Sequence, residues 1–426
     1  MEEALYQNHL AILKKELTVA LGCTEPIAIA FVAAKARRVL ETEPVSCVVR
    51  CSGNIIKNVM GVTVPNSGGQ RGIDVAATLG IVGGDPDLEL AVLEPVTQAH
   101  IDQVKVLLDQ GFCRCELVEG VENLYIQVLL TDAQGNTAQV EAREYHSNIT
   151  QIVKNGRTLQ SNGGNRASVQ SDGGEKSLLT VKNILEFADC VRMEDVKEVI
   201  DRQISYNTAI SREGLSGHYG VEAGQVLMSH GGQDDLRIRA RAAAAAGSDA
   251  RMSGCPLPVV INSGSGNQGI TITLPVVEYA KHHHVSEEGL RRALVAANLL
   301  SVHQKKYIGS LSAYCGAVSA ACSAAAGIAY MLGEPFEVIC DTITNTIATI
   351  GGMVCDGAKS SCATKIATAV DCALNALELA REKHVFQPGE GLVKQDVETT
   401  IRSVGRMGCV GMRSTDVEIL NIMLEH

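Results

Sequence analysis

The longest uncharged stretch of the chain is the feature that most restricts its fold. Residues 307–333 carry no charged side chain over 27 positions, which exceeds the length that a bilayer-spanning helix needs. The stretch is dominated by alanine, serine and glycine, however, and no aromatic belt or basic cluster flanks it. We therefore predict a central helix of a globular protein, buried on all sides and closely packed, and no membrane segment.

Helical periodicity occurs at both ends of the chain. Leucines at helical spacing predict a first helix over residues 3–21, and Thr24, Glu25 and Pro26 are typical of the first turn of a second helix that runs to about Leu40. From Glu175 onward the periodicity is again helical. The clearest helices predicted there cover residues 236–246, 290–300, 314–331, 336–350 and 363–380.

The segment between these helical parts has the pattern of strands. It contains alternating or short apolar runs at residues 45–51, 88–93, 124–130 and 137–143, and a helical pattern at 100–110. The third and fourth runs are separated by the turn-like residues 132–136 and are expected to form a hairpin. An α+β unit over residues 43–155 follows from this pattern.

These patterns predict an α+β protein in which a mostly helical domain contains an inserted α+β domain. The helical domain is discontinuous and consists of residues 1–42 and 175–426, and the inserted domain is 43–155. Residues 156–174 contain five glycines with serine and asparagine among them, which indicates a linker or flexible loop. With 426 residues, 46% of them hydrophobic, the chain can bury the cores of two or three cooperative units.

Composition excludes some functions and favours one compartment. The chain has 37 Lys and Arg against 48 Asp and Glu, 3% aromatic residues and no Trp, so it offers little basic surface and few stacking platforms for nucleic acid. The N-terminus lacks the basic and apolar regions of a signal peptide, and we therefore expect a cytoplasmic protein. A small-molecule partner is expected, and a homo-oligomer stays open.

Fourteen cysteines in a reducing compartment are not expected to form disulfides. Cys355 lies in a glycine-rich turn and Cys362 near the start of a predicted helix, where free N–H groups favour an anionic centre such as an iron–sulfur cluster. Cys315, among small residues, is a candidate third ligand. The Cys-x6-Cys spacing matches neither ferredoxins nor zinc fingers, so buried structural cysteines are the alternative.

Cys23 is a further candidate because it directly precedes a predicted helix. The helix macrodipole favours a thiolate there, which suits a base, a nucleophile or a metal ligand. Glu25 adds a like charge that opposes this effect. The alternative is a cysteine that only fills the turn.

Two polar glycine-rich loops, residues 65–72 and 262–269, are candidates for binding a substrate carboxylate. They offer backbone N–H groups together with hydroxyl and amide side chains, and they match neither a phosphate loop nor a dinucleotide fingerprint. Ordinary turns are the alternative. The candidate substrate-binding residues are Asn66, Arg71, Asn262, Ser263, Ser265 and Asn267, with Lys57, which follows a predicted strand.

Four separated segments together resemble a known family. Residues 22–28 (Gly-Cys-Thr-Glu-Pro-Ile-Ala), residues 53–60, the loop 262–269 and the cysteines at 315, 355 and 362 follow the order seen in the iron–sulfur L-serine dehydratase alpha-chain superfamily. Serine dehydratases have a hydroxyl-rich segment in place of Gly22–Pro26. At this segment the chain resembles the L-cysteine desulfidase branch instead. The resemblance spans nearly the whole chain.

The resemblance implies a 4Fe-4S cluster held by Cys315, Cys355 and Cys362, with one iron open to substrate, and a catalytic role for Cys23. It implies a lyase that eliminates the β-substituent of a small amino acid, and favours the conversion of L-cysteine to pyruvate, ammonia and hydrogen sulfide. An open iron would act as Lewis acid, and the Cys23 thiolate would take the Cα proton. Lys57 or Arg71 would help the loops to grip the carboxylate.

Other functions stay open on the sequence alone. They are an L-serine dehydratase, a non-enzymatic iron–sulfur sensor or binding module, a metal-free scaffold and a pyridoxal phosphate enzyme. The last is disfavoured because no lysine stands in a recognisable cofactor setting.

Overall fold

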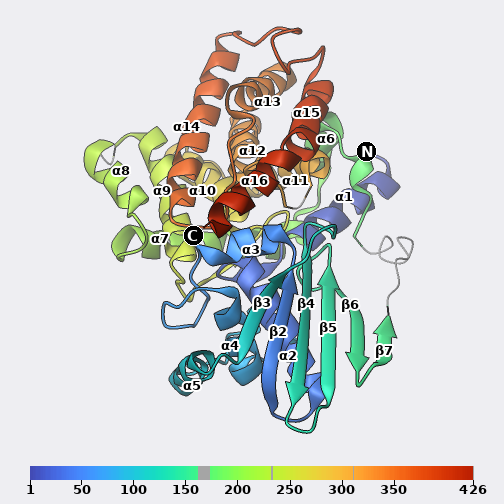
Figure 1. Ribbon diagram of the computed structural model, residues 1–426. Helices are drawn as coiled ribbons and strands as arrows, with labels where there is room; N and C mark the ends of the chain where they lie inside the picture. Colours follow the sequence, from blue (N-terminus) through green and yellow to red (C-terminus); the bar gives the residue numbers. More distant parts are fainter. Residues whose placement is uncertain (162–172, 232–233, 310, 426) are drawn as a thin grey trace.

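Most of the helices gather in one part of the molecule, and the other part is a six-stranded sheet with a few helices against one face (Figure 1). The computed structural model describes residues 1–161, 173–231, 234–309 and 311–425. The fold is α+β and mostly helical, as the sequence predicts. The helical part contains α1 (Glu3–Glu16), α6 (Val181–Cys190), α7 (Met193–Ser216), α8 (Ala223–Gly231), α9 (Leu236–Met252), α10 (Gly266–His282), α11 (Glu287–Ile308), α12 (Gly316–Met331), α13 (Phe336–Ile350), α14 (Ser361–Arg381), α15 (Val397–Arg406) and α16 (Arg413–Leu424).

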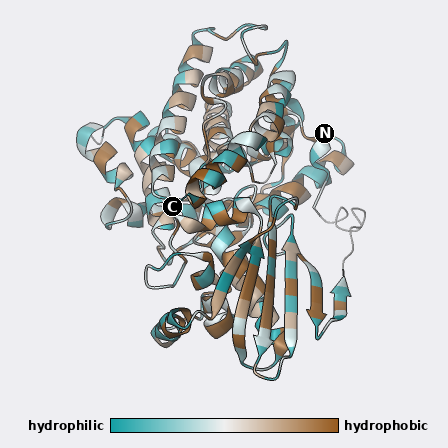
Figure 2. Cartoon of the chain, viewed as in Figure 1, coloured by the Kyte–Doolittle hydropathy of each residue, from teal (hydrophilic) through white to brown (hydrophobic). Residues whose placement is uncertain are grey.

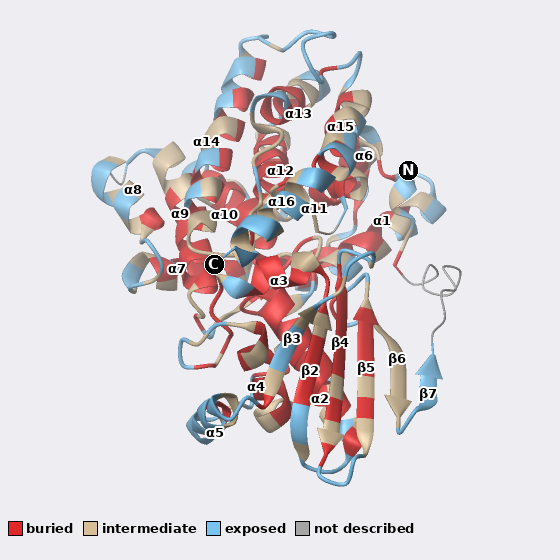
Figure 3. Ribbon diagram, viewed as in Figure 1, coloured by how far each residue is buried: buried red, intermediate tan, exposed pale blue. Residues whose placement is uncertain are grey.

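Helix α12 is the centre of the helical part. It packs against α10, α11, α13 and α14, and its residues from Ala317 to Ala329 are all buried (Figure 3). Alanine, serine and glycine dominate it because small side chains let the neighbouring helices approach closely. The prediction of a buried central helix is confirmed. No helix in the described ranges is both long and apolar enough to cross a membrane.

The sheet has the strand order β3-β2-β4-β5-β6-β7. Strands β2 and β3 are parallel and the other neighbours are antiparallel. The predicted hairpin is confirmed as β4 and β5, and polar and apolar residues alternate in bands along these strands (Figure 2). The strands are β2 (Pro44–Cys51), β3 (Cys113–Leu117), β4 (Tyr125–Asp132), β5 (Thr137–Arg143), β6 (Ile149–Lys154) and β7 (Arg157–Ser161).

Helices cover one face of the sheet and form a second hydrophobic core with it. Helix α2 (Thr24–Leu40) packs on β4 and β5 and on α4 (Ile73–Gly83), with α5 (Gln98–Asp109) outside α4 and α3 (Gly53–Met60) near the helical part (Figure 1). Gly80 lets α4 touch α2, because a Cβ there would lie 2.3 Å from the carbonyl oxygen of Ala30. Helix α2 therefore shares the core of the sheet, whereas the sequence places residues 1–42 together in the helical domain.

Three segments differ from their predicted structure. Helix α1 ends at Glu16, and β1 (Val19–Leu21) pairs with β8 (Pro258–Val260). The predicted strand at 88–93 is wrong, because Pro86, with Asp85 as its cap, begins the 3-10 helix η1 (Pro86–Ala91). The predicted linker at 156–174 begins with strand β7 at the sheet edge, and its residues 162–172 lie outside the described residues.

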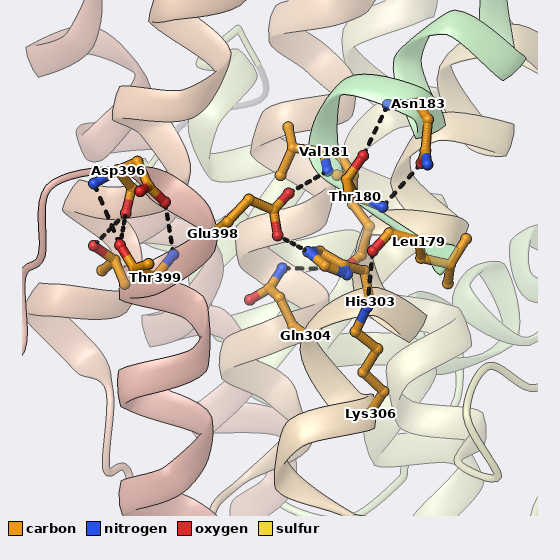
Figure 4. A network of polar contacts seen from close by, with 12 residues as sticks. Leu179, Thr180, Val181, Asn183, His303, Gln304, Lys306, Asp396, Glu398 and Thr399 are labelled. Carbon is orange, nitrogen blue, oxygen red and sulfur yellow. Dashed lines mark hydrogen bonds and ion pairs between the residues drawn. The ribbon is translucent and has the colours of Figure 1, made fainter. Parts of the chain in front are cut away.

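A buried polar network joins α15 to the rest of the helical part (Figure 4). One carboxylate oxygen of Glu398 accepts from the backbone N–H of Val181, 2.6 Å away, at the start of α6. The other lies 2.8 Å from Nε2 of His303 on α11. Burial lowers the pKa of His303, so that its ring is neutral at pH 7 and Nε2 donates to Glu398. One carboxylate thus ties three helices together.

Replacing Glu398 by alanine is expected to lower the free energy of unfolding by about 2 kcal/mol, because the Val181 N–H and the buried His303 ring lose their acceptor. Urea unfolding followed by circular dichroism measures the change. Glu186→Ala, at an exposed position on α6, is the matched control and is expected to shift stability by less than about 0.5 kcal/mol. Equal stability of the two variants would contradict the structural role of Glu398.

Candidate active site

A cavity of about 680 Å³ lies where the two cores meet. Its wall includes the loop after β5 on the sheet side and parts of α9, α11, α12 and α14 on the helical side. Its size is typical of small-molecule sites. Cys23, Cys315, Cys355 and Cys362, the four cysteines singled out in the sequence, all line it.

Main-chain pairing brings Cys315 and Cys355 together across 40 positions of sequence. Tyr314 and Val354 form an antiparallel bridge. Cys315 N–H donates to the carbonyl of Met353 at 2.9 Å, and Cys355 N–H donates to that of Ala313 at 2.6 Å. Cys315 is the N-cap of α12, directly before the first helical turn.

Cys362 reaches the same cavity from the first turn of α14. Its backbone N–H donates to the carbonyl of Lys359, within the turn that also carries Cys355. The local fold therefore places Cys315 and Cys362 at helix N-termini and Cys355 in a glycine-containing turn. The sequence predicts the positions of Cys355 and Cys362, but not that Cys315 is an N-cap residue.

The electrostatic environment favours an anion among these thiols. Interaction with the Cys315 thiol lowers the pKa of Cys355 to about 6, and Lys57 and Lys365 add to this effect. The same interaction raises the pKa of Cys315, and burial raises that of Cys362. One negative charge is thus favoured in the Cys315–Cys355 pair near neutral pH.

The donor set of the three thiols has the chemistry of iron–sulfur cluster ligands. Among the described residues, no group of three or more His, Cys, Asp or Glu side chains is arranged to hold one metal ion. In a cluster each thiolate binds a different iron, so the three sulfur atoms need to surround one cluster but need not meet at one ion. An all-sulfur donor set at helix starts, with lysines nearby, fits that group in chemistry.

Cys23, the N-cap residue of α2, lies on the cavity wall beside an ionised carboxylate. Its Sγ–H donates to Oε2 of Glu25 at 3.1 Å, and the Thr24 hydroxyl donates to the same oxygen at 3.0 Å. Burial alone would raise the pKa of Glu25, but His146, the Cys23 thiol and Arg251 lower it to about 2. Glu25 is therefore charged inside the protein.

The resting state of Cys23 differs from the thiolate that its position before a helix suggests. Burial, and then the charge of Glu25, raise the pKa of Cys23 well above its ordinary value. Arg251 opposes this shift only in part. Cys23 therefore rests as a thiol, and the negative charge of the pair resides on Glu25.

His146, in the loop after β5, completes this side of the cavity. Its Nε2 lies 3.9 Å from Oε1 of Glu25, beyond hydrogen-bond distance, and finds no hydrogen-bond partner among the described residues. The ring is 9% exposed and packs beside Gly264. The sheet part of the molecule thus contributes a titratable group to the site.

The predicted loop at residues 262–269 forms part of the cavity wall, where it presents Ser263, Ser265 and Asn267. Asn262 is fully buried beneath them and is absent from that wall. Its amide donates to Asn298 on α11, while its own oxygen accepts from the Ser263 hydroxyl. Asn262 therefore fixes the loop, and Ser263 is held there with a φ of 50°, which is uncommon for a residue other than glycine.

Three other predicted substrate-binding residues lie away from the cavity wall. The Lys57 ammonium is buried, pairs with Asp416 on α16 and donates to the carbonyl of Cys355 at 3.3 Å. The Asn66 amide donates to the carbonyl of Leu93. Arg71 is exposed, and its main chain forms an antiparallel β-bridge with that of Thr63. The loop at residues 65–72 thus satisfies its own polar groups, while Lys57 supports the turn that carries Cys355.

The cavity contains two buried cations that the sequence analysis did not single out, Arg251 on α9 and Lys305 on α11. They are 3% and 6% exposed, and burial lowers the pKa of Lys305 to about 8. The position of Arg251 in an alanine-rich helix could have indicated a buried charge, because small apolar residues surround it in the sequence. The sequence gives no such indication for Lys305. Lys305 and Lys306 are adjacent near the end of a helix, where lysines are commonly exposed to solvent.

Comparison with known proteins gives consistent matches. The serine dehydratase alpha chain family matches residues 87–421. A UPF0597 protein of Finegoldia magna is 46% identical over 98% of this chain and 100% of its own length. The UPF0597 protein of Desulfitobacterium hafniense is 48% identical over 99% of this chain and 98% of its own length. That of Treponema denticola is 41% identical over 100% of this chain and 99% of its own length.

Glu25→Gln is expected to lower the pKa of Cys23, because the neighbouring negative charge that disfavours the thiolate is removed. The pH profile of iodoacetamide labelling at Cys23, followed by peptide mass spectrometry, should therefore move to lower pH. Glu144→Gln removes another carboxylate of the cavity wall and is the matched control. A labelling profile that is unchanged in Glu25→Gln would contradict the assigned interaction.

Proposed function

The chain belongs to the serine dehydratase alpha-chain family, which makes it a dehydratase-like amino-acid lyase, and from this premise we propose that it is an L-cysteine desulfidase. The reaction converts L-cysteine and water to pyruvate, ammonia and hydrogen sulfide. In this proposal Cys315, Cys355 and Cys362 hold a 4Fe-4S cluster, and Cys23 acts on the Cα proton.

One observation carries the proposal: the four thiols share a cavity with an ionised carboxylate and two buried cations. A β-elimination needs a Lewis acid at the leaving group, a proton acceptor at Cα and a counter-charge for the carboxylate. The thiols at 315, 355 and 362 serve the first need, the Cys23–Glu25 pair the second and the cations the third.

When bound, the cluster supplies a Lewis-acidic iron for the sulfur of the substrate, a soft ligand that iron binds well. The residues around it set the charge of that end of the cavity. Lys57 pairs with Asp416, and Lys365 shares Asp356 with Lys359, whereas Lys305 has no carboxylate within ion-pair distance among the described residues. Lys305 therefore has its full charge available to offset the negative charge of a cluster.

Cys23 and Glu25 can accept the Cα proton as a unit. The Cys23 proton already points at Oε2 of Glu25, so Sγ can take the Cα proton while its own proton passes to the carboxylate. The Cys23 side chain is then again a neutral thiol, and Glu25 is protonated. The aminoacrylate left by loss of sulfide hydrolyses in water to pyruvate and ammonia.

L-serine is the rival substrate, and the name of the matched family favours it. The two substrates differ only in the leaving group, and a hydroxyl needs a proton donor more than a sulfide does. Comparing kcat/KM for L-cysteine and L-serine on the same anaerobic preparation separates the two activities. A higher kcat/KM for serine would replace the proposed desulfidase by a dehydratase.

Cys23→Ala is expected to lower kcat for pyruvate formation by about 10²–10⁴-fold, because the thiol that takes the Cα proton and passes its own proton to Glu25 is removed. The visible absorption of the cluster should be unchanged, since Cys23 is not one of its proposed ligands. Cys190→Ala, at an exposed cysteine, is the matched control for activity. Wild-type turnover in Cys23→Ala would exclude the role of Cys23.

Serine at position 315, 355 or 362 is expected to reduce the iron and sulfide content of anaerobically purified protein, because each variant removes one thiolate ligand. Metal analysis and visible absorption measure the loss, and circular dichroism checks the fold. Cys322→Ser tests a buried cysteine of α12 outside the cavity wall and should keep its iron. Full iron content in all three ligand variants would refute the assignment.

A further inference from the structure

Two cations on the cavity wall, Arg251 and Lys305, are buried without an ion-pair partner among the described residues. The other lysines near the thiols are paired with aspartates, and Lys176 pairs with Glu16. Lys306 donates to the main-chain carbonyls of Lys176 and Leu179. A buried charge without a fixed partner is costly unless an anion enters the cavity. Lys15 also lines the cavity, but it is exposed to solvent. Arg251 and Lys305 are therefore the buried cations that an anionic ligand can reach.

The two cations lie on different sides of the cavity. The charges that act on Lys305 include those of Cys355 and Cys315, besides that of Lys176, which places Lys305 near the proposed cluster ligands. Arg251 acts on Cys23 and Glu25 instead. Its Nε donates to the carbonyl of Gly22 at 2.9 Å, directly before Cys23 in the chain.

The guanidinium of Arg251 is held in one orientation by contacts on two sides. Besides the Nε bond, Nη1 donates to the Asn267 side-chain oxygen at 3.2 Å. Gly266 lies against its planar group, because a Cβ at this position would be 2.3 Å from Nε and 2.7 Å from Cζ. The absence of a side chain at position 266 thus makes room for Arg251 at the cavity wall.

We propose that Arg251 binds the α-carboxylate of the substrate, and that Asn267 and Gly266 position it. The inference rests on the proposed function in one respect: Cys23 takes the Cα proton. The carboxylate is bonded to Cα, so it must lie next to Cys23, and Arg251 is the buried cation on that side. Guanidinium groups bind carboxylates through parallel N–H donors, which fixes orientation as well as charge.

This assignment moves the carboxylate site away from the residues that the sequence suggested. Lys57 is occupied by Asp416 and Arg71 is exposed, and neither lines the cavity. The loop at residues 262–269 keeps its predicted part in binding, but it acts through Asn267, which orients Arg251, as well as through its own donors. The ligand class is therefore a small molecule with a free carboxylate next to the reacting carbon.

The test measures binding rather than turnover, by calorimetry on the anaerobically purified full chain. L-alanine has the α-amino and α-carboxylate groups but no leaving group, and L-alaninamide lacks the carboxylate charge. Wild-type protein should bind L-alanine at least about 10-fold more tightly than L-alaninamide. Arg251→Gln should lose at least about 10-fold in affinity for L-alanine and abolish this preference, and Arg251→Lys should restore part of it.

Two further variants separate binding from a structural role. Gly266→Ala should weaken L-alanine binding as well, because its Cβ displaces the guanidinium. Arg237→Gln, on the same helix, removes an arginine that pairs with Asp371 away from the cavity wall, and should leave L-alanine affinity unchanged. Circular dichroism confirms that each variant is folded.

Two results would overturn the inference: a folded Arg251→Gln variant that binds L-alanine as wild type does, or a wild-type protein that does not prefer L-alanine over L-alaninamide. Failure of the proposed function gives a different outcome. Wild-type protein would then prefer L-alanine through Arg251, yet release no pyruvate from L-cysteine or L-serine with a full iron content.

Discussion

The short main-chain pairing between residues 313–315 and 353–355 is the contact on which the site depends. Helices α12 and α13 account for most of the chain between the three thiols, and this pairing joins the start of α12 to the turn before α14. The small residues of α12 let the neighbouring helices pack closely, which brings the two main-chain segments together. The pairing is then favoured because it gives their N–H groups acceptors. The thiol arrangement is thus a consequence of helix packing.

Charge balance explains why this region accepts an anion. Lysines surround the cysteine-bearing turn: Lys57 pairs with Asp416, whereas Lys359 and Lys365 share the single carboxylate of Asp356. Arg251 and Lys305 are buried on the cavity wall without an ion-pair partner among the described residues, and Glu25 is a buried carboxylate whose pKa Arg251 lowers. A zwitterionic amino acid and an anionic cofactor both supply the negative charge that is missing, which favours their binding from water.

Sequence patterns predicted what depends on local periodicity, and they failed where long-range contacts decide. The hairpin of β4 and β5 and the buried helix α12 follow from strand alternation and from composition. The role of Lys57 could not be predicted, because its partner Asp416 lies 359 positions away. Nothing in the sequence around Lys305 distinguishes it from a solvated lysine. The three cysteines were singled out from their local setting, but their spacing alone was weak, and only the family resemblance implied that they form one ligand set.

The helix start at Cys23 shows how burial can redirect a local electrostatic rule. The macrodipole of α2 favours a negative charge in its first turn, and Glu25 takes that charge while Cys23 keeps its proton. Arg251 contributes to the low pKa of Glu25. If a substrate carboxylate binds Arg251, part of that cation's charge is neutralised, and the pKa of Glu25 rises. Glu25 would then be a better proton acceptor when substrate is bound, which couples recognition of the carboxylate to removal of the Cα proton.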